Sequence, residues 1–220
     1  MAVSDYQLIE AWQEVLRLSK LEAGQTVTLL TSSTTHPQTL QCAQIAAQSM
    51  GAIVNRLDLL PVNAEKALSR DSLAYLGTTP LTGNEAAIAA LKASDLVLDL
   101  MTLLFSPEQI DILKSGTKIL LAVEPPEILV RTVPTEADRA RVTAAAALIQ
   151  AAQAIREYGF VDEPGRWDHW PSGFVLTWPN ERGTNGTIVI DKGDILLPQK
   201  KYSTEQIILT VENGYATKIE

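Results

Sequence analysis

The sequence is poor in the residues that form disulfides and metal sites. It contains one cysteine, Cys42, and two histidines, His36 and His169, among 220 residues. A single cysteine excludes a disulfide within the chain and is typical of the reducing cytoplasm. The common zinc and iron sites use two or three imidazoles. A site of one histidine with two carboxylates stays open, but these counts favour no metal site in this chain.

Further features that the sequence lacks exclude several classes of protein. No run of about 18 apolar residues is present, and the start, MAVSDYQLIEAW, has no basic segment followed by an apolar core, so we expect neither a membrane span nor a signal peptide. The net charge is −8 without a run of Lys or Arg, which argues against nucleic acid or a membrane surface as partner. The glycine-rich nucleotide-binding motifs and the G-x-S-x-G elbow of hydrolases are missing. These absences favour a cytoplasmic protein.

The first part of the chain alternates between strand and helix patterns. With 46% hydrophobic and 20% charged residues, the chain has the composition of a folded globular protein. Strands are predicted at 26–31, 52–59, 95–101 and 118–123, and helices at 4–20, 39–50, 84–94, 106–116 and 135–157. Ser4 and Ser106 are expected to cap their helices. This order predicts a doubly wound α/β fold with a parallel sheet.

After Glu157 the predicted structure becomes antiparallel β. Turn-forming residues are dense there, and Asn213-Gly214 between alternating apolar residues is a strong hairpin signal. We therefore predict an α/β N-terminal domain at 1–156 and, at 157–220, the start of a β-rich C-terminal catalytic domain. The chain ends on a predicted strand, whose open edge leads us to expect that further sequence normally follows.

The segment from Glu157 to Trp170 holds the most informative group of polar residues. A histidine beside carboxylates can transfer protons near neutral pH, and tryptophan rings can exclude water. The alternative is a rigid connection in which Arg166 pairs with a carboxylate and the rings pack as core, and residue types alone favour it. The residues concerned are Glu157, Asp162, Glu163, Arg166, Trp167, Asp168, His169 and Trp170, with Trp178 nearby.

Two further places have a functional and a structural interpretation. The loop SSTTHP at 32–37 follows the first strand, where α/β sheets bind anions, but it has no glycine, so hydroxyls that cap the next helix are favoured. The run at 101–105 follows a strand and is expected to form either a pocket wall or core. Cys42 lies in a predicted helix among Ala and Ile, which favours a buried, unreactive thiol.

Several segments together resemble one enzyme family. They are SPEQ, KILLAVEPPEILVR, PTEADRARV, EYGFVDEPGRWDHWPSGFVLTWPNE and GTIVIDKGDILLP. They resemble the 2,5-dihydroxypyridine 5,6-dioxygenase family, which is related to metal-dependent thermophilic aminopeptidases. The resemblance covers essentially the whole chain. It implies a cytoplasmic, homo-oligomeric Fe²⁺ oxidoreductase that cleaves 2,5-dihydroxypyridine with O₂ to N-formylmaleamate, an extradiol-type reaction of nicotinate and nicotine degradation.

The resemblance also assigns expected site residues. It implies catalytic roles for His169 and Glu157 and a substrate-binding wall of Leu104, Phe105 and Trp170. In the family the position of Phe105 can be a histidine that acts as a base, and phenylalanine cannot accept a proton, so a different pyridine or a different base is expected here. The family's metal ligands, two His and one Asp, lie in a C-terminal part without counterpart in this chain. An aminopeptidase-like metallohydrolase and a non-catalytic truncated relative remain the alternatives.

Overall fold

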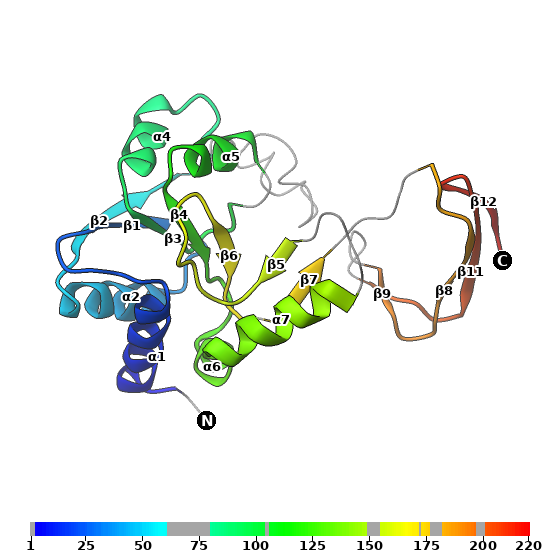
Figure 1. Ribbon diagram of the computed structural model, residues 1–220, viewed down its shortest axis with the longest axis horizontal. Helices are drawn as coiled ribbons and strands as arrows, with labels where there is room; N and C mark the ends of the chain where they lie inside the picture. Colours follow the sequence, from blue (N-terminus) through cyan, green and yellow to red (C-terminus); the bar gives the residue numbers. More distant parts are fainter. Residues whose placement is uncertain are drawn as a thin grey trace.

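A five-stranded parallel sheet forms the centre of the α/β part (Figure 1). The computed structural model describes residues 3–60, 80–103, 106–148, 155–171, 173–176, 182–196 and 201–220. The strand order is β2-β1-β3-β4-β6, and every neighbouring pair is parallel. The strands are β1 (Thr26–Thr31), β2 (Ile53–Asp58), β3 (Leu96–Asp99), β4 (Lys118–Leu121) and β6 (Trp167–His169). The predicted α/β class with a parallel sheet is confirmed.

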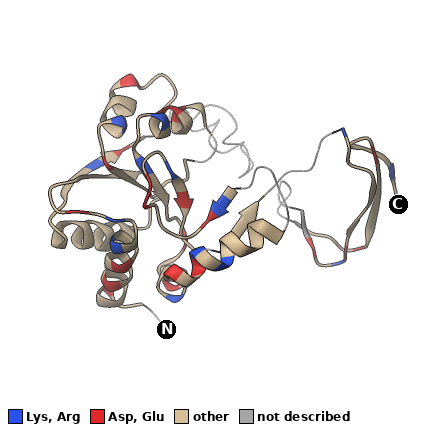
Figure 2. Ribbon diagram, viewed as in Figure 1, with Lys and Arg blue, Asp and Glu red and all other residues tan. Residues whose placement is uncertain are grey.

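Helices connect these strands, and several begin at the predicted caps. Ser4 accepts a hydrogen bond from the backbone N–H of Gln7, and Ser106 accepts one from that of Gln109. The described helices are α1 (Asp5–Leu18), α2 (Pro37–Ser49), α4 (Glu85–Lys92), α5 (Pro107–Lys114), α6 (Pro126–Arg131) and α7 (Glu136–Leu148). In α1, α4, α5 and α6 the first turn holds an acidic residue and the last turn a basic one, which suits the helix dipole (Figure 2). None of the helices in the described ranges is long and apolar enough to cross a membrane.

The sheet is buried on both faces because helices cover each of them. Leu29 and Leu98 point into a core with Trp12 of α1, whereas their neighbours Leu30 and Val97 belong to a second core beside α4 and α5. Successive side chains of a strand alternate between faces, so a strand covered on both sides is apolar throughout. This explains why β1 and β3 are buried on both faces, with buried polar residues such as Thr28 held by hydrogen bonds.

One strand beyond the predicted domain boundary at residue 156 joins the parallel sheet. β6 lies beyond it, yet it pairs with β4 as the fifth strand of the parallel sheet. β5 (Ile155–Glu157), predicted as the end of the long helix, is a strand that pairs antiparallel with β7 (Phe174–Leu176). Strands of three residues carry too little periodicity to be recognised in the sequence. Their pairing is decided by tertiary contacts.

The last part of the chain forms antiparallel sheets, as expected. β8 (Gly186–Ile190), β11 (Ile207–Glu212) and β12 (Tyr215–Ile219) form one sheet, and β9 (Ile195–Leu196) pairs with β10 (Lys201–Tyr202). Asn213 and Gly214, with φ of 52° and 84°, make the predicted two-residue turn between β11 and β12. Figure 1 shows the β8–β11–β12 sheet set apart from the parallel sheet.

Candidate active site at the carboxyl ends of the strands

The end of β6 brings one histidine between two carboxylates. His169 Nε2 lies 3.0 Å from Glu124 Oε1, and His169 Nδ1 lies 3.4 Å from Glu157 Oε2. Glu124 follows β4, and Glu157 closes β5. All three side chains are largely buried, with the histidine 24% exposed. Residues from three strand ends therefore meet at one polar site.

The two glutamates determine the charge of the imidazole. Burial by itself lowers the pKa of His169, but the hydrogen bonds to Glu124 and Glu157 outweigh it and raise the pKa to about 9. At neutral pH the ring is therefore a cation with both nitrogens protonated. A cationic His169 can donate hydrogen bonds and stabilise a negative charge, but it cannot act as a general base until it loses its proton.

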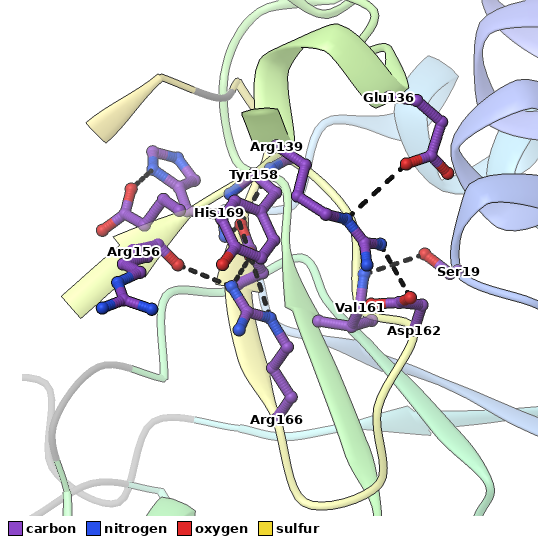
Figure 3. A network of polar contacts seen from close by, with 12 residues as sticks. Ser19, Glu136, Arg139, Arg156, Tyr158, Val161, Asp162, Arg166 and His169 are labelled. Atoms are coloured by element: carbon purple, nitrogen blue, oxygen red, sulfur yellow. Dashed lines mark hydrogen bonds and ion pairs between the residues drawn. The ribbon is translucent and has the colours of Figure 1, made fainter. Parts of the chain in front are cut away.

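A buried carboxylate next to this histidine holds the segment in place. Asp168 accepts hydrogen bonds from the backbone N–H groups of Tyr158, Gly159 and His169, at 2.8 to 3.0 Å. Arg166 Nη2 donates to Asp168 at 2.7 Å, and its guanidinium lies 4.1 Å from the centre of the Tyr158 ring (Figure 3). Burial raises the pKa of Asp168, against the opposing effects of these N–H groups and of Arg166. These contacts connect β6 to the residues that follow β5 and so hold the backbone next to His169.

A second buried carboxylate fastens the preceding loop to the helices. Asp162 pairs with Arg139 of α7 at 2.7 Å and with Lys20 at 3.0 Å. Burial by itself raises the pKa of Asp162, but the bonds to Arg139 and Lys20 lower it by more, so the pKa lies below its usual value. Figure 3 shows the Arg139 guanidinium between Glu136 and Asp162. Arg166 thus pairs with a carboxylate, as the simpler sequence interpretation proposed, and Asp162 is likewise held in ion pairs.

Trp170 lies in the core rather than on a pocket wall. Its side chain is fully buried and packs edge-on against Trp12, with ring centres 4.9 Å apart. Its Nε1–H donates to the carbonyl of Thr132 at 3.0 Å. Because no surface of the ring remains open, this position differs from the predicted substrate-binding wall. The ring of Trp170 instead packs in the core next to the end of β6. Trp178 lies outside the described residues.

A cavity of about 370 Å³ opens beside Glu124. It lies where β1 and β3 meet, the point at which the connections of the sheet turn to opposite sides and where α/β proteins commonly bind ligands. Asp99, at the end of β3, is buried and accepts hydrogen bonds from the N–H groups of Met101 and Leu103. Burial raises its pKa to about 6. The wall consists of Thr34, Thr35, His36, Thr39, Leu100, Met101, Thr102, Ala122, Val123, Glu124 and Pro125.

The structure therefore adds residues that the sequence prediction missed. Glu124 and Asp99 were assigned no role, although Asp99 ends β3 and Glu124 comes three residues after β4, both at the carboxyl edge of the sheet, which is the signal that could have identified them. Leu104 and Phe105 lie outside the described residues. Glu157 and His169, predicted as catalytic, lie next to each other.

The described residues offer no complete metal site. No group of three or more His, Cys, Asp or Glu is arranged to hold an ion among them. Cys42 is buried, and burial raises the pKa of its thiol, as expected for an unreactive core cysteine. The residues that the structure describes thus do not form an iron centre.

The fold, the cavity and the polar site together define a class of protein. A doubly wound parallel sheet with a cavity at its topological switch point, and titratable side chains at the strand ends, is the arrangement of an α/β small-molecule enzyme. The family model described as NicX, 2,5-dihydroxypyridine 5,6-dioxygenase, matches residues 7–157 and 152–220. The chain belongs to the 2,5-dihydroxypyridine 5,6-dioxygenase family, which confirms the family predicted from its sequence.

Individual relatives agree with this assignment. A curated 2,5-dihydroxypyridine 5,6-dioxygenase of Pseudomonas putida KT2440 is 48% identical over 239 residues, covering 100% of this chain and 68% of its own length. The solved structure of the 2,5-dihydroxypyridine dioxygenase from the same organism matches with a TM-score of 0.92 at 48% identity, over 100% of this chain and 69% of that one. Wild-type AmpT from Thermus thermophilus matches with a TM-score of 0.53 at 15% identity, over 97% of this chain and 71% of that one, which shows a shared fold alone.

Proposed function

We propose that this protein cleaves the ring of 2,5-dihydroxypyridine with O₂ to give N-formylmaleamate, as an Fe²⁺-dependent extradiol-type dioxygenase of nicotinate or nicotine degradation. The observation that carries the proposal is the cationic His169 held between Glu124 and Glu157 at the carboxyl ends of the strands. The name of the 48% identical relative supports the reaction. The iron ligands are assigned, by family resemblance, to the third of that relative that has no counterpart here.

His169 is suited to stabilise a negatively charged oxygen on the ring. Ring cleavage requires an electron-rich, deprotonated dihydroxypyridine. The contact from Nδ1 to Glu157 is the longer of the two, at 3.4 Å against 3.0 Å on the Glu124 side. A substrate oxygen that approaches this side receives a hydrogen bond from a charged donor, which is stronger than one from a neutral donor.

Glu157 is suited to take the proton. Phe105 cannot accept one, and His169 already carries its own, so a carboxylate is the remaining titratable partner at this site. In the proposed step the proton of a ring hydroxyl moves to Glu157 Oε2, and the oxyanion left behind is bound by the Nδ1–H of His169. Glu124 keeps His169 cationic throughout and is a positioning residue.

Oxygen consumption by the complete protein with 2,5-dihydroxypyridine tests this function. We expect His169→Ala to lower turnover on the order of 10²-fold, because the charged donor is lost. Glu14→Ala, which removes a surface ion pair with Arg17, is the matched control and should leave turnover unchanged.

Two outcomes would contradict the proposal at different levels. A normal rate in His169→Ala would remove this residue from the mechanism. No oxygen uptake by the iron-loaded wild-type protein, together with two bound metal ions per chain, would instead favour the aminopeptidase-like alternative.

We also propose that the protein is a cytoplasmic homo-oligomer. The buried, reduced Cys42 is consistent with a reducing compartment. In the described strands, the β8–β11–β12 sheet has β8 and β12 as its edges, and sheet edges favour pairing with another chain. Sedimentation of the complete protein measures the oligomeric state directly.

A further inference from the structure

The beginning of α2 differs from the predicted capped helix. His36 is its N-cap residue, and its side chain makes no capping hydrogen bond. The hydroxyls of the preceding loop are used elsewhere: Thr35 Oγ1 donates to the carbonyl of Leu100 at 2.8 Å, and Ser32 Oγ bonds with Thr34. The first turn of α2 contains no acidic residue. The predicted capping of α2 by these hydroxyls is therefore wrong, and no described side chain caps its first N–H groups.

A buried hydroxyl at the same place also lacks a partner. Thr39 is 2% exposed and lines the cavity beside Glu124, and its Oγ1 forms no hydrogen bond within the described residues. Leaving a buried hydroxyl unpaired destabilises the folded state. Natural sites tolerate this cost where a ligand supplies the missing bond, so Thr39 is an independent indication that the cavity takes a hydrogen-bonding group.

We propose that the cavity at the start of α2 binds the carboxylate of a small organic acid. The N-terminus of α2, with its partial positive charge, borders the cavity, because its N-cap His36 and Thr39 both line it; the first N–H groups of the helix are those of Gln38 and Thr39. The Thr39 hydroxyl provides a third donor. A carboxylate offers two acceptor oxygens for these three donors, and the ligand's carbon chain contacts the apolar wall formed by Met101, Ala122 and Val123.

The charge of the wall selects a carboxylate over a phosphate. Glu124 lines the same cavity, and its Oε1 is bonded to His169 at 3.0 Å, so its charge is largely compensated. A single negative charge is tolerated beside such a pair, whereas the second charge of a phosphate adds repulsion. The cavity shares Glu124 with the proposed proton-transfer site, but carboxylate binding there does not depend on the proposed ring cleavage.

Backbone amide NMR shifts of Gln38 and Thr39 report binding independently of turnover. The probes are butyrate, its neutral analogue butyramide, and maleamate, which carries the carboxylate and amide of the proposed product. We expect butyrate or maleamate to shift both amides, and butyramide to shift neither. Tighter binding of maleamate indicates that the acid comes from the reaction, and equal binding indicates an acid from solution.

Three variants test the role of the hydroxyl. Thr39→Val should weaken carboxylate binding roughly tenfold or more, since a hydrogen bond to a charged group is lost. Thr39→Ser keeps the hydroxyl and should bind like wild type. Thr28→Val is the matched control, because Thr28 is equally buried but bonded to Ser94 and lies outside the cavity wall.

The unliganded state gives a second readout. Because Thr39→Val removes a hydroxyl without a partner, its unfolding temperature should equal or exceed that of wild type. Butyrate binding that is unchanged in Thr39→Val, or equal binding of butyramide, would overturn the proposal. So would the absence of any shift in wild type, whether or not the protein consumes oxygen with 2,5-dihydroxypyridine.

Discussion

His169 shows how two neighbours change the chemistry of a single residue. An exposed histidine is mostly neutral at pH 7, whereas the carboxylates of Glu124 and Glu157 keep this one protonated. Its identity was apparent in the sequence, but its charge was not, because Glu124 lies 45 positions away along the chain. The residue that we expected to exchange protons near neutrality is therefore better suited to act as a charged donor.

The raised pKa of His169 predicts how stability depends on pH. The folded protein binds this proton more tightly than the unfolded chain, whose histidine has a pKa of 6.5. The resulting stabilisation, on the order of 3 kcal/mol, is fully present below pH 6.5 and is lost as the pH rises through about 9. Urea unfolding of wild type and His169→Gln across this interval measures it, and the difference in unfolding free energy should shrink toward high pH.

The contribution of the His169 proton is taken from the difference in unfolding free energy between wild type and His169→Gln. Asp99, whose pKa burial raises to about 6, titrates at the low end of this pH interval; because the charge of His169 lowers that pKa, the comparison rests on the high-pH end. A difference that stays constant from pH 6.5 to about 9 would show that His169 is neutral in the folded protein.

At the scale of elements, the pairing of β6 with β4 depends on one tight turn. Gly165 has φ of 69°, and its N–H donates to the carbonyl of Gly116 at 2.9 Å. A Cβ atom at Gly165 would lie 2.8 Å from the carbonyl oxygen of Leu113, which belongs to a helix and cannot move aside. The adjacent bond from Ile119 N–H to the Arg166 carbonyl starts the β4–β6 ladder. The turn therefore sets the position of β6 and, with it, of His169.

Gly165→Ala should consequently destabilise the protein by about 2–3 kcal/mol, from the left-handed backbone conformation and the close contact together. Gly24→Ala is the control: its φ is 86°, but nothing lies within 4 Å of the added Cβ, so we expect a loss of about 1 kcal/mol. Chemical denaturation measures both. Equal losses of stability in Gly165→Ala and Gly24→Ala would mean that the turn moves to make room for the Cβ atom at no cost in free energy.

The elements also show what local patterns can predict. The spans of β1, α4 and α5 agree with their predictions to within one or two residues, because periodic apolar residues and caps such as Ser106 are local signals. α6 was not predicted, and β5 was taken for the end of a helix. Both are short, so neighbouring packing outweighs their intrinsic preference.

At the scale of the whole molecule, the parallel sheet and the β8–β11–β12 sheet differ in burial. Leu29 and Leu98 of the parallel sheet are fully buried. In the antiparallel sheet, Ile188, Val189 and Ile219 are between 49% and 72% exposed. A three-stranded sheet with little buried apolar surface opens more readily than a sheet covered on both faces.

Hydrogen exchange should therefore separate the two parts. We expect amides of β8, β11 and β12 to exchange roughly tenfold or more faster than those of β1, β3 and β4, as measured by mass spectrometry. Equal protection would show that another surface, such as a second copy of the chain, covers the antiparallel sheet, in agreement with the proposed homo-oligomer.

The sequence by itself determined the family, the α/β class and most strands and helices, because these rest on local patterns and a long specific segment, and through the family resemblance it proposed His169 and Glu157 as site residues. Only the tertiary structure decided that β6 joins the parallel sheet, that Trp170 is core, and that Glu124 contacts His169. Those facts depend on contacts between distant residues. Burial and charge pairing depend on which residues lie close together in space, so no periodic pattern in the sequence predicts them.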